Sequence, residues 1–273
     1  NCEARVLVTV PEARLVAQLM RGDVPTLAHV TTPDELSVRD DGFTPVAASP
    51  DDIAFLQYTS GSTGSPKGVV LTHAHLLANM RAMGHAALAT SRDVFVSWLP
   101  LYHDMGLIGA WLTTLYFSIP LVLMSPLAFL SRPSRWLRAV HDYRGTISAA
   151  PNFAYEIVAS RLDEREIEGV DLSTLRWAFN GAEAINAETM ERFATRLAKY
   201  GLDPKSIAPV YGLAEVALCG AFPATRRGQL VDVIDRETLR STGRARPVDH
   251  DDPVAQKIVA CGRALPGYGV RIA

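Results

Sequence analysis

The feature that most limits how this chain can fold is a repeated alternation of two hydrophobic patterns. Short runs rich in β-branched residues are followed by segments whose apolar residues recur at helical spacing. Strands are expected at 5–10, 53–58, 69–71, 94–99, 119–124, 146–149, 175–179 and 207–210, and helices at 11–20, 75–88, 106–117, 133–143, 152–162 and 187–200. This rhythm predicts an α/β fold in which layered, mainly parallel sheets are flanked by helices.

Three polar stretches follow predicted strands, at 58–68, 180–183 and 211–215. In open α/β sheets, ligands bind at the carboxyl ends of the strands. We therefore expect these three stretches to contribute to one binding site.

The stretch 58–68 reads YTSGSTGSPKG and has the composition of a phosphate-binding loop. Its glycines allow backbone N–H groups to point at an anion, and its hydroxyls and Lys67 can bind phosphate oxygens. It is not a Walker A loop, because Pro66 precedes Lys67 and Gly68 follows it. The alternative is a flexible linker, but Pro66 and the flanking hydrophobic strands favour phosphate binding.

Three other stretches carry candidate site residues. In WLPLYHDMGL (98–107), His103 is a candidate to meet an anionic substrate group or to be a structural histidine, and Asp104 is expected to cap the next helix. NGAEAI (180–185) and VYGLAEVAL (210–218) each place a glutamate shortly after a strand. Tyr211 offers a ring to stack on a base, and Glu215 offers an oxygen ligand for Mg²⁺. Their structural alternatives are a core-edge tyrosine and a helix-capping glutamate.

Composition excludes several classes of function. The net charge of −2 and the scattered basic residues give no reason to expect a nucleic-acid partner. Residues 105–124 carry no charge, but Pro120 and several glycines favour a helix followed by a strand over a membrane span. The three cysteines form no CxxC pair, which favours reduced thiols and a cytoplasmic location.

The character of the chain changes after residue 222. Residues 223–257 are polar and rich in Arg and Asp, which predicts a surface excursion with a short helix near 235–239. Residues 258–273 return to strand-like and turn-like sequence. The expected division is therefore a core over 1–222, an insertion over 223–257 and the start of a further β subdomain over 258–273.

Taken in order, YTSGSTGSPKG, WLPLYHDMGL, NGAE and YGLAE resemble the motifs of the adenylate-forming superfamily, which includes acyl-CoA synthetases, luciferases and peptide-synthetase adenylation domains. Within it, FLQYTSGSTG, LPLYHDMGLIG, YGLAE and CGRALPGYGVRI look like those of fatty acyl-AMP ligases. The excursion at 223–257 corresponds in position to the insertion that marks these ligases. The resemblance covers essentially the whole chain, and implies the fold of the superfamily's N-terminal domain.

The resemblance implies activation of a medium- or long-chain fatty acid by ATP and Mg²⁺ to acyl-AMP, with release of diphosphate. The acyl group would then pass to the phosphopantetheine of an acyl carrier protein in a lipid, polyketide or peptide synthase. The implied phosphate loop consists of Thr59, Ser60, Gly61, Ser62, Thr63, Gly64 and Lys67. The implied base and nucleotide contacts are Gly181, Ala182, Glu183, Tyr211, Gly212, Leu213 and Ala214, with Glu215 on Mg²⁺ and His103 beside the acyl carboxylate.

The chain also departs from the superfamily's pattern. Ala214 stands where many members have Thr, although the ligase subgroup shares Ala. The ribose-binding Asp, the hinge and the C-terminal domain with its catalytic Lys would follow residue 273, so the chain is expected to be a core piece of a larger enzyme. The alternatives are an acyl-CoA synthetase and a non-catalytic nucleotide-binding module of a megasynthase. An apolar tunnel for the acyl chain is expected along 106–123 and the helix around Tyr155.

Overall fold

The computed structural model describes residues 2–36, 44–59 and 66–271. Contacts within the chain separate two units, Asn1–Ser49 and Pro50–Ala273. In the first unit, β1 (Val6–Val8) pairs in parallel with β2 (His29–Thr31). Between them lie the short helices η1 (Pro11–Ala13), α1 (Arg14–Leu19) and η2 (Met20–Gly22), and η3 (Pro33–Glu35) follows β2. The strand and helix expected over 5–20 are confirmed.

The second unit begins with an antiparallel hairpin of β3 (Ile53–Thr59) and β4 (Lys67–Thr72), in which Thr59 pairs with Lys67. Both strands were predicted, but placing 58–68 at the end of a parallel strand was wrong. A connection this short permits only antiparallel pairing, because parallel neighbours need a long crossover. Helix α2 (His73–Ala86) follows at once, and the Thr72 hydroxyl accepts a hydrogen bond from the His75 N–H at its start.

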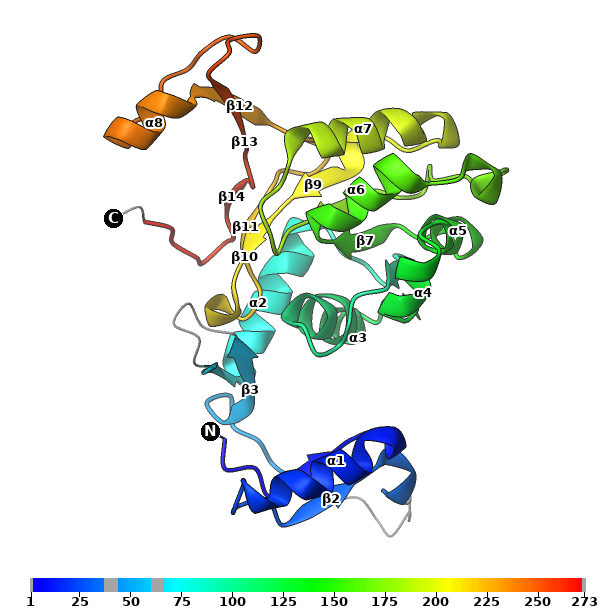
Figure 1. The fold of residues 1–273 in the computed structure, drawn as a ribbon, viewed down its shortest axis with the longest axis vertical. Coiled ribbons are helices and arrows are strands. Elements are labelled where there is room, and N and C mark those ends of the chain that lie inside the picture. Colours follow the sequence, from blue (N-terminus) through cyan, green and yellow to red (C-terminus); the bar gives the residue numbers. More distant parts are fainter. Residues whose placement is uncertain (1, 37–43, 60–65, 272–273) are drawn as a thin grey trace. The chain divides into compact units, whose positions relative to one another are not determined.

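The main sheet has five parallel strands in the order β6-β5-β7-β8-β9, which confirms the predicted fold class. Its strands are β5 (Phe95–Ser97), β6 (Leu121–Leu123), β7 (Ile147–Ala150), β8 (Trp177–Asn180) and β9 (Ile207–Pro209). The helices between them are the π-helix η4 (Met105–Leu112), α3 (Thr113–Tyr116), α4 (Pro126–Ser131), α5 (Ser134–Asp142), α6 (Asn152–Arg161) and α7 (Ala187–Leu197), with η5 (Glu164–Ile167), η6 (Ala198–Tyr200) and η7 (Pro204–Ser206). Figure 1 shows α6 and α7 side by side, as their contacts require. Asn186 caps α7, as predicted.

The two faces of this sheet pack against different helices. Successive residues of a strand point to opposite faces. Ser148 of β7 accepts a hydrogen bond from the Trp136 indole of α5 at 2.8 Å. The face of the sheet on which Ser148 lies therefore packs against α5, α6 and α7. The core there contains the fully buried rings of Trp136, Tyr155 and Phe193. The alternate residues, such as Ile147 and Phe179, face the other way.

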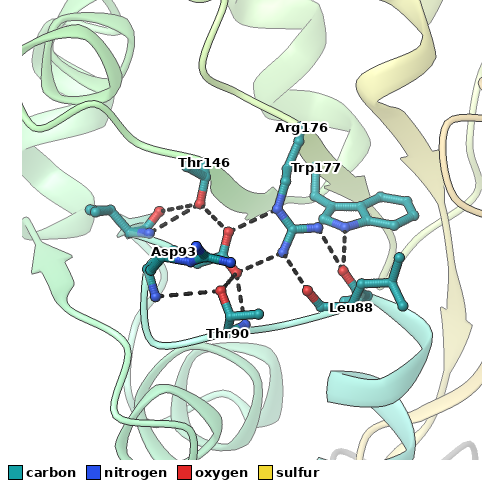
Figure 2. A network of polar contacts seen from close by, with 9 residues as sticks. Leu88, Thr90, Asp93, Thr146, Arg176 and Trp177 are labelled. Atoms are coloured by element: carbon teal, nitrogen blue, oxygen red, sulfur yellow. Dashed lines mark hydrogen bonds and ion pairs between the residues drawn. The ribbon is translucent and has the colours of Figure 1, made fainter.

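A network of polar contacts binds the amino ends of the strands to the end of α2 (Figure 2). The Arg176 guanidinium forms two hydrogen bonds with the Asp93 carboxylate, at 2.8 and 2.7 Å. It also donates to the carbonyls of Ala87 and Leu88. Thr146 donates to Asp93 at 2.8 Å. Burial alone would raise the pKa of Asp93, but these hydrogen bonds and the charge of Arg176 hold it below its ordinary value.

The excursion after Phe222 is more ordered than its polar sequence suggests. Strand β12 (Val231–Asp235) pairs antiparallel with β13 (Ala255–Val259), and α8 (Arg236–Thr242) lies between them. The short helix is confirmed, but the strands were missed because only Val233, Ile234 and Asp235 of β12 are buried. The boundaries at 222 and 257 stay a prediction, and β13 runs across residue 257.

The chain segments just before and just after the excursion lie next to each other, at Phe222 and Gly262. Gly262, with φ of 101°, lies so close to the chain that a Cβ would meet the Phe222 carbonyl oxygen at 2.0 Å. There β11 (Cys219–Phe222) pairs with β14 (Arg263–Ala264) on one side and with β10 (Tyr211–Gly212) on the other.

The uncharged segment 105–124 forms η4, α3 and then β6, which confirms the predicted helix followed by a strand. Within the described ranges, no helix combines the length and apolar character needed to cross a membrane.

Candidate active site

Two cavities meet at the carboxyl ends of β8 and β9. The first cavity has a volume of about 270 Å³ and extends between the sheet, α2 and η4. The second has a volume of about 470 Å³ and lies between residues 182–185 and β13. The two cavities share four of their lining residues, which form the boundary between them: Ala182, Val210, Tyr211 and Gly212.

The first cavity is deep and its walls are mostly apolar. It is lined at the strand ends by Gly181 and further in by Ile147. Ile147 pairs with Trp177, four residues before Gly181, so the cavity follows the strands for roughly 13 Å at about 3.3 Å per residue. The hydroxyls of the lining residues Thr113 and Thr114 donate to helix carbonyls. Such a space suits an alkyl chain better than a polar ligand.

Of the two segments expected to line an apolar tunnel, one lines the first cavity and the other does not. From 106–123, Gly109, Thr113 and Ile119 line the first cavity, and Met105 just before this segment does so as well. Tyr155 does not, because it lies in the core on the opposite face of the sheet. Sequence reasoning missed the contribution of α2, which lines the cavity with Met83 and Gly84, and of Ala87, which follows the helix. The small size of Gly84 and Ala87 on a buried face was the available signal.

His103 and Asp104 lie at the mouth of the first cavity, after β5. The Asp104 carboxylate accepts a hydrogen bond from the Met105 N–H at 2.7 Å, which confirms the predicted helix cap. The same oxygen lies 2.8 Å from His103 Nδ1. The hydrogen bond between His103 and the Asp104 carboxylate raises the pKa of His103 above its ordinary value, although burial of the ring opposes this shift. The His103 side chain is 48% exposed, so a ligand can reach it.

We expect Asp104→Asn to lower the pH at which His103 titrates. A neutral amide no longer stabilises the imidazolium through charge, so the ring loses its proton more readily. NMR titration of the histidine ring protons measures this, with the His103 signal identified from a His103→Gln variant. If His103 titrates at the same pH with Asp104→Asn, another group must hold its proton.

The segment Gly181–Ala182–Glu183 lies between the two cavities and α6. Ala182 has φ of 71°, which is unusual for a residue with a side chain. The Glu183 carboxylate accepts a hydrogen bond from the Phe153 N–H at 2.6 Å, in the first turn of α6. A negative charge is favourable at that end of a helix. The Glu183 side chain thus ties this segment to α6.

The stretch 211–215 turns sharply between β10 and the short helix η8 (Ala214–Val216). Gly212 approaches the chain so closely that a Cβ would meet the Leu218 carbonyl oxygen at 1.8 Å. Tyr211 is 55% exposed and Glu215 is also exposed, whereas Ala214 is buried. Tyr211 lies outside the hydrophobic core. Glu215 lies in the first turn of η8, where no side-chain hydrogen bond from the described part of the chain caps the helix. Strand β4 contacts η8, which brings the Lys67 hairpin beside the Glu215 turn.

Asn79 fixes the strand that follows this turn, and sequence reasoning missed it. Its buried amide donates to the Cys219 carbonyl at 2.7 Å and accepts from the Cys219 N–H at 3.1 Å. Because Asn79 belongs to α2, it couples the helix after the β3–β4 hairpin to β11. Cys219 itself lines the first cavity as a neutral thiol, since burial raises its pKa to about 12. None of the three cysteines forms a disulfide.

The structure brings many of the predicted site residues together. Around the first cavity lie His103, Gly181, Ala182, Tyr211, Gly212 and Leu213, and around the second lie Ala182, Glu183, Tyr211 and Gly212. Thr59, Lys67, Ala214 and Glu215 line neither cavity. Ser60, Gly61, Ser62, Thr63 and Gly64 lie outside the described residues. The individual roles of all these residues stay predictions.

Comparison with known proteins settles the family. A model of the family described as AMP-binding enzyme matches residues 1–273. The chain belongs to this family. It is 44% identical over 203 residues to a medium-chain-fatty-acid–[acyl-carrier-protein] ligase from Teredinibacter turnerae, covering 73% of this chain and 32% of that protein. It is 39% identical over 223 residues to a long-chain-fatty-acid–AMP ligase from Mycobacterium bovis, covering 80% and 38%.

Solved structures of this AMP-binding family agree with the observed fold. A structure from a study of fatty acyl-adenylate ligases of E. coli and L. pneumophila matches with a TM-score of 0.90 and 37% identity, over 97% of this chain and 48% of that one. A fatty acyl-adenylate ligase from L. pneumophila in complex with acyl adenylate and pyrophosphate matches with a TM-score of 0.85 and 34% identity, over 97% and 46%. The chain thus spans less than half of the length of each of these relatives.

Proposed function

We propose that this chain is the core of a fatty acyl-AMP ligase, which activates a medium- or long-chain fatty acid with ATP. The observation that carries the proposal is the first cavity: an apolar space whose mouth holds His103 and adjoins Tyr211 and Gly181. An alkyl chain in this cavity would place its carboxylate at the mouth. The names of the relatives agree with such a substrate.

The reaction forms a bond between a carboxylate oxygen and the α-phosphorus while the bond to the diphosphate oxygen breaks. The fatty carboxylate is ionised at neutral pH and needs no general base. Catalysis therefore depends on positioning and on charge stabilisation. His103 as an imidazolium would hold the carboxylate or α-phosphate, and Lys67 would stabilise charge on the leaving diphosphate.

Mg²⁺ fits the site as a metal held jointly with substrate. Among the described residues there is no cluster of three or more His, Cys, Asp or Glu that could hold a metal alone. Glu215 offers one exposed carboxylate beside β4. Mg²⁺ in such enzymes is commonly bound by one or two carboxylates and substrate phosphates, and it neutralises charge on those phosphates. Glu215 would orient it.

For the second step, the proposed acceptor is the phosphopantetheine thiol of an acyl carrier protein. The thiol sulfur would bond to the acyl carbon and AMP would leave. The relative from Teredinibacter turnerae is named as an acyl-carrier-protein ligase, which supports this choice over coenzyme A. We further propose a cytoplasmic location.

The test uses the longest natural form of the protein with dodecanoate, ATP and Mg²⁺. Fatty-acid-dependent diphosphate release and acyl-adenylate detected by mass spectrometry are expected, with transfer to a carrier protein and poor transfer to coenzyme A. Efficient acyl-CoA formation would instead identify an acyl-CoA synthetase. Absence of adenylate with any carboxylate would favour the non-catalytic module.

We expect Gly109→Met to shift the preferred substrate toward shorter acyl chains. A Cβ at Gly109 would lie 2.9 Å from the Leu218 side chain, so a longer side chain must extend into the first cavity. For dodecanoate, kcat/KM should fall about 10- to 200-fold, because the space of a methylene group in a hydrophobic pocket changes the free energy by about 1–3 kcal/mol. The measurement is diphosphate release across a series of fatty acids. Equal loss for short and long chains would contradict this location of the acyl chain.

A further inference from the structure

The second cavity is built from two parts of the chain that lie far apart in sequence. One wall comes from residues 182–185 and from 210–212, after β8 and β9. The opposite wall comes from β13 in the excursion, with Gln256, Lys257, Ile258 and Val259. The motifs alone assign nucleotide contacts only to the first wall. The excursion therefore completes a space that those motifs leave open on one side.

Specific contacts attach the excursion to this position. Lys257 Nζ lies 3.2 Å from Glu188 Oε1, and the Gln229 amide donates to the Ala187 carbonyl at 3.2 Å. Glu188 and Ala187 begin α7, immediately after the residues of the first wall. Within the excursion, Gln256 pairs with Ile234 in a continuous antiparallel register. The position of Gln256 relative to the cavity is thus set by backbone pairing and by two side-chain contacts.

Among the polar side chains that line the second cavity, Gln256 is the one best placed to form hydrogen bonds with a ligand. Among its lining residues, Glu183 bonds the Phe153 N–H and Lys257 pairs with Glu188. The other side chains are apolar, apart from the Tyr211 hydroxyl and the Cys261 thiol. Gln256 is half-buried and forms no side-chain hydrogen bond within the described ranges. A carboxamide offers a donor and an acceptor side by side, which matches an edge of adenine.

We infer that the excursion forms one wall of the base-binding pocket and that Gln256 binds the edge of the adenine ring while Tyr211 stacks on its face. This inference rests on the proposed adenylate-forming function. In this inference, the excursion helps to select the nucleotide, because it supplies one wall of the pocket that binds the base.

The test compares Gln256→Leu and Gln256→Glu in the longest natural form of the protein. Both should raise the KM for ATP about tenfold, the scale of one lost bidentate contact to a base. The KM for the fatty acid should stay the same, and the preference for ATP over GTP should fall. Arg240→Gln, an exposed change on α8 of the same excursion, is the matched control and should leave all three values unchanged.

The outcomes separate the inference from the proposed function. Wild-type KM for ATP and an unchanged ATP preference in both Gln256 variants would overturn the inference, while adenylate formation would leave the function standing. If the unsubstituted protein forms no adenylate, the proposed function itself fails. Gln256→Glu keeps the size of the side chain, so it carries the test even if Gln256→Leu does not fold.

Discussion

Replacing Lys67 by Ala is expected to lower the rate of acyl-adenylate formation by about 100-fold or more, the scale measured when one group that stabilises transition-state charge is removed. Lys67 is exposed at the start of β4, and β4 contacts the Glu215 turn. Its ammonium can therefore meet the leaving diphosphate without disturbing the core. The measurement is kcat for dodecanoate-dependent diphosphate release by the longest natural form of the protein.

The matched control for this change is Lys205→Ala. Lys205 is another exposed lysine, in the short helix η7, which directly precedes β9 and lies far from the hairpin in sequence. Its loss should leave kcat within twofold, since surface substitutions usually have small effects. An unchanged rate with Lys67→Ala would show that Lys67 does not stabilise the diphosphate.

Replacing Arg176 by Met is expected to lower the free energy of unfolding by about 3 kcal/mol or more, because breaking a buried pair leaves an uncompensated charge. Asp93 is only 7% exposed and receives two of the hydrogen bonds of Arg176 (Figure 2). The Leu88 carbonyl also loses the donor that Arg176 supplies, whereas the Ala87 carbonyl keeps the Trp177 indole N–H at 2.9 Å. Urea unfolding at neutral pH gives this value directly.

The pH dependence of this loss has a definite sign. The folded-state pKa of Asp93 is depressed, so its ionised form stabilises the fold above the unfolded-state pKa, and this stabilisation is lost as pH falls through the folded-state pKa. The difference between the Arg176→Met variant and the unsubstituted protein should therefore shrink in acid. A constant difference at every pH would mean that packing, and not the ion pair, explains the loss.

Arg192→Met provides the comparison. Arg192 pairs with Glu156 on α6, but the side chains are 52% and 41% exposed. Exposed ion pairs contribute at most about 1 kcal/mol. A loss for Arg192→Met as large as for Arg176→Met would contradict the assigned importance of burial.

The sequence predicted the elements better than it predicted their partners. The periodicity of 187–200 and the N-cap at Asn186 located α7, because both signals are local. It did not distinguish the β3–β4 hairpin from a strand of the parallel sheet, since strand pairing is set by distant contacts. For the same reason it expected the helix of Tyr155 to line an apolar tunnel, whereas no described residue of that helix lines the first cavity.

By itself, the sequence determined the α/β class, the order of the elements and the motifs that mark an adenylate-forming core, because hydrophobic period and glycine-rich turns are local properties of the chain. Only the tertiary structure decided which residues share a cavity. Met83 of α2 and Gln256 of β13 lie far in sequence from Tyr211, yet each borders a cavity that Tyr211 also lines. Such neighbours follow from the packing of helices on a sheet face and from strand register, which no single segment encodes.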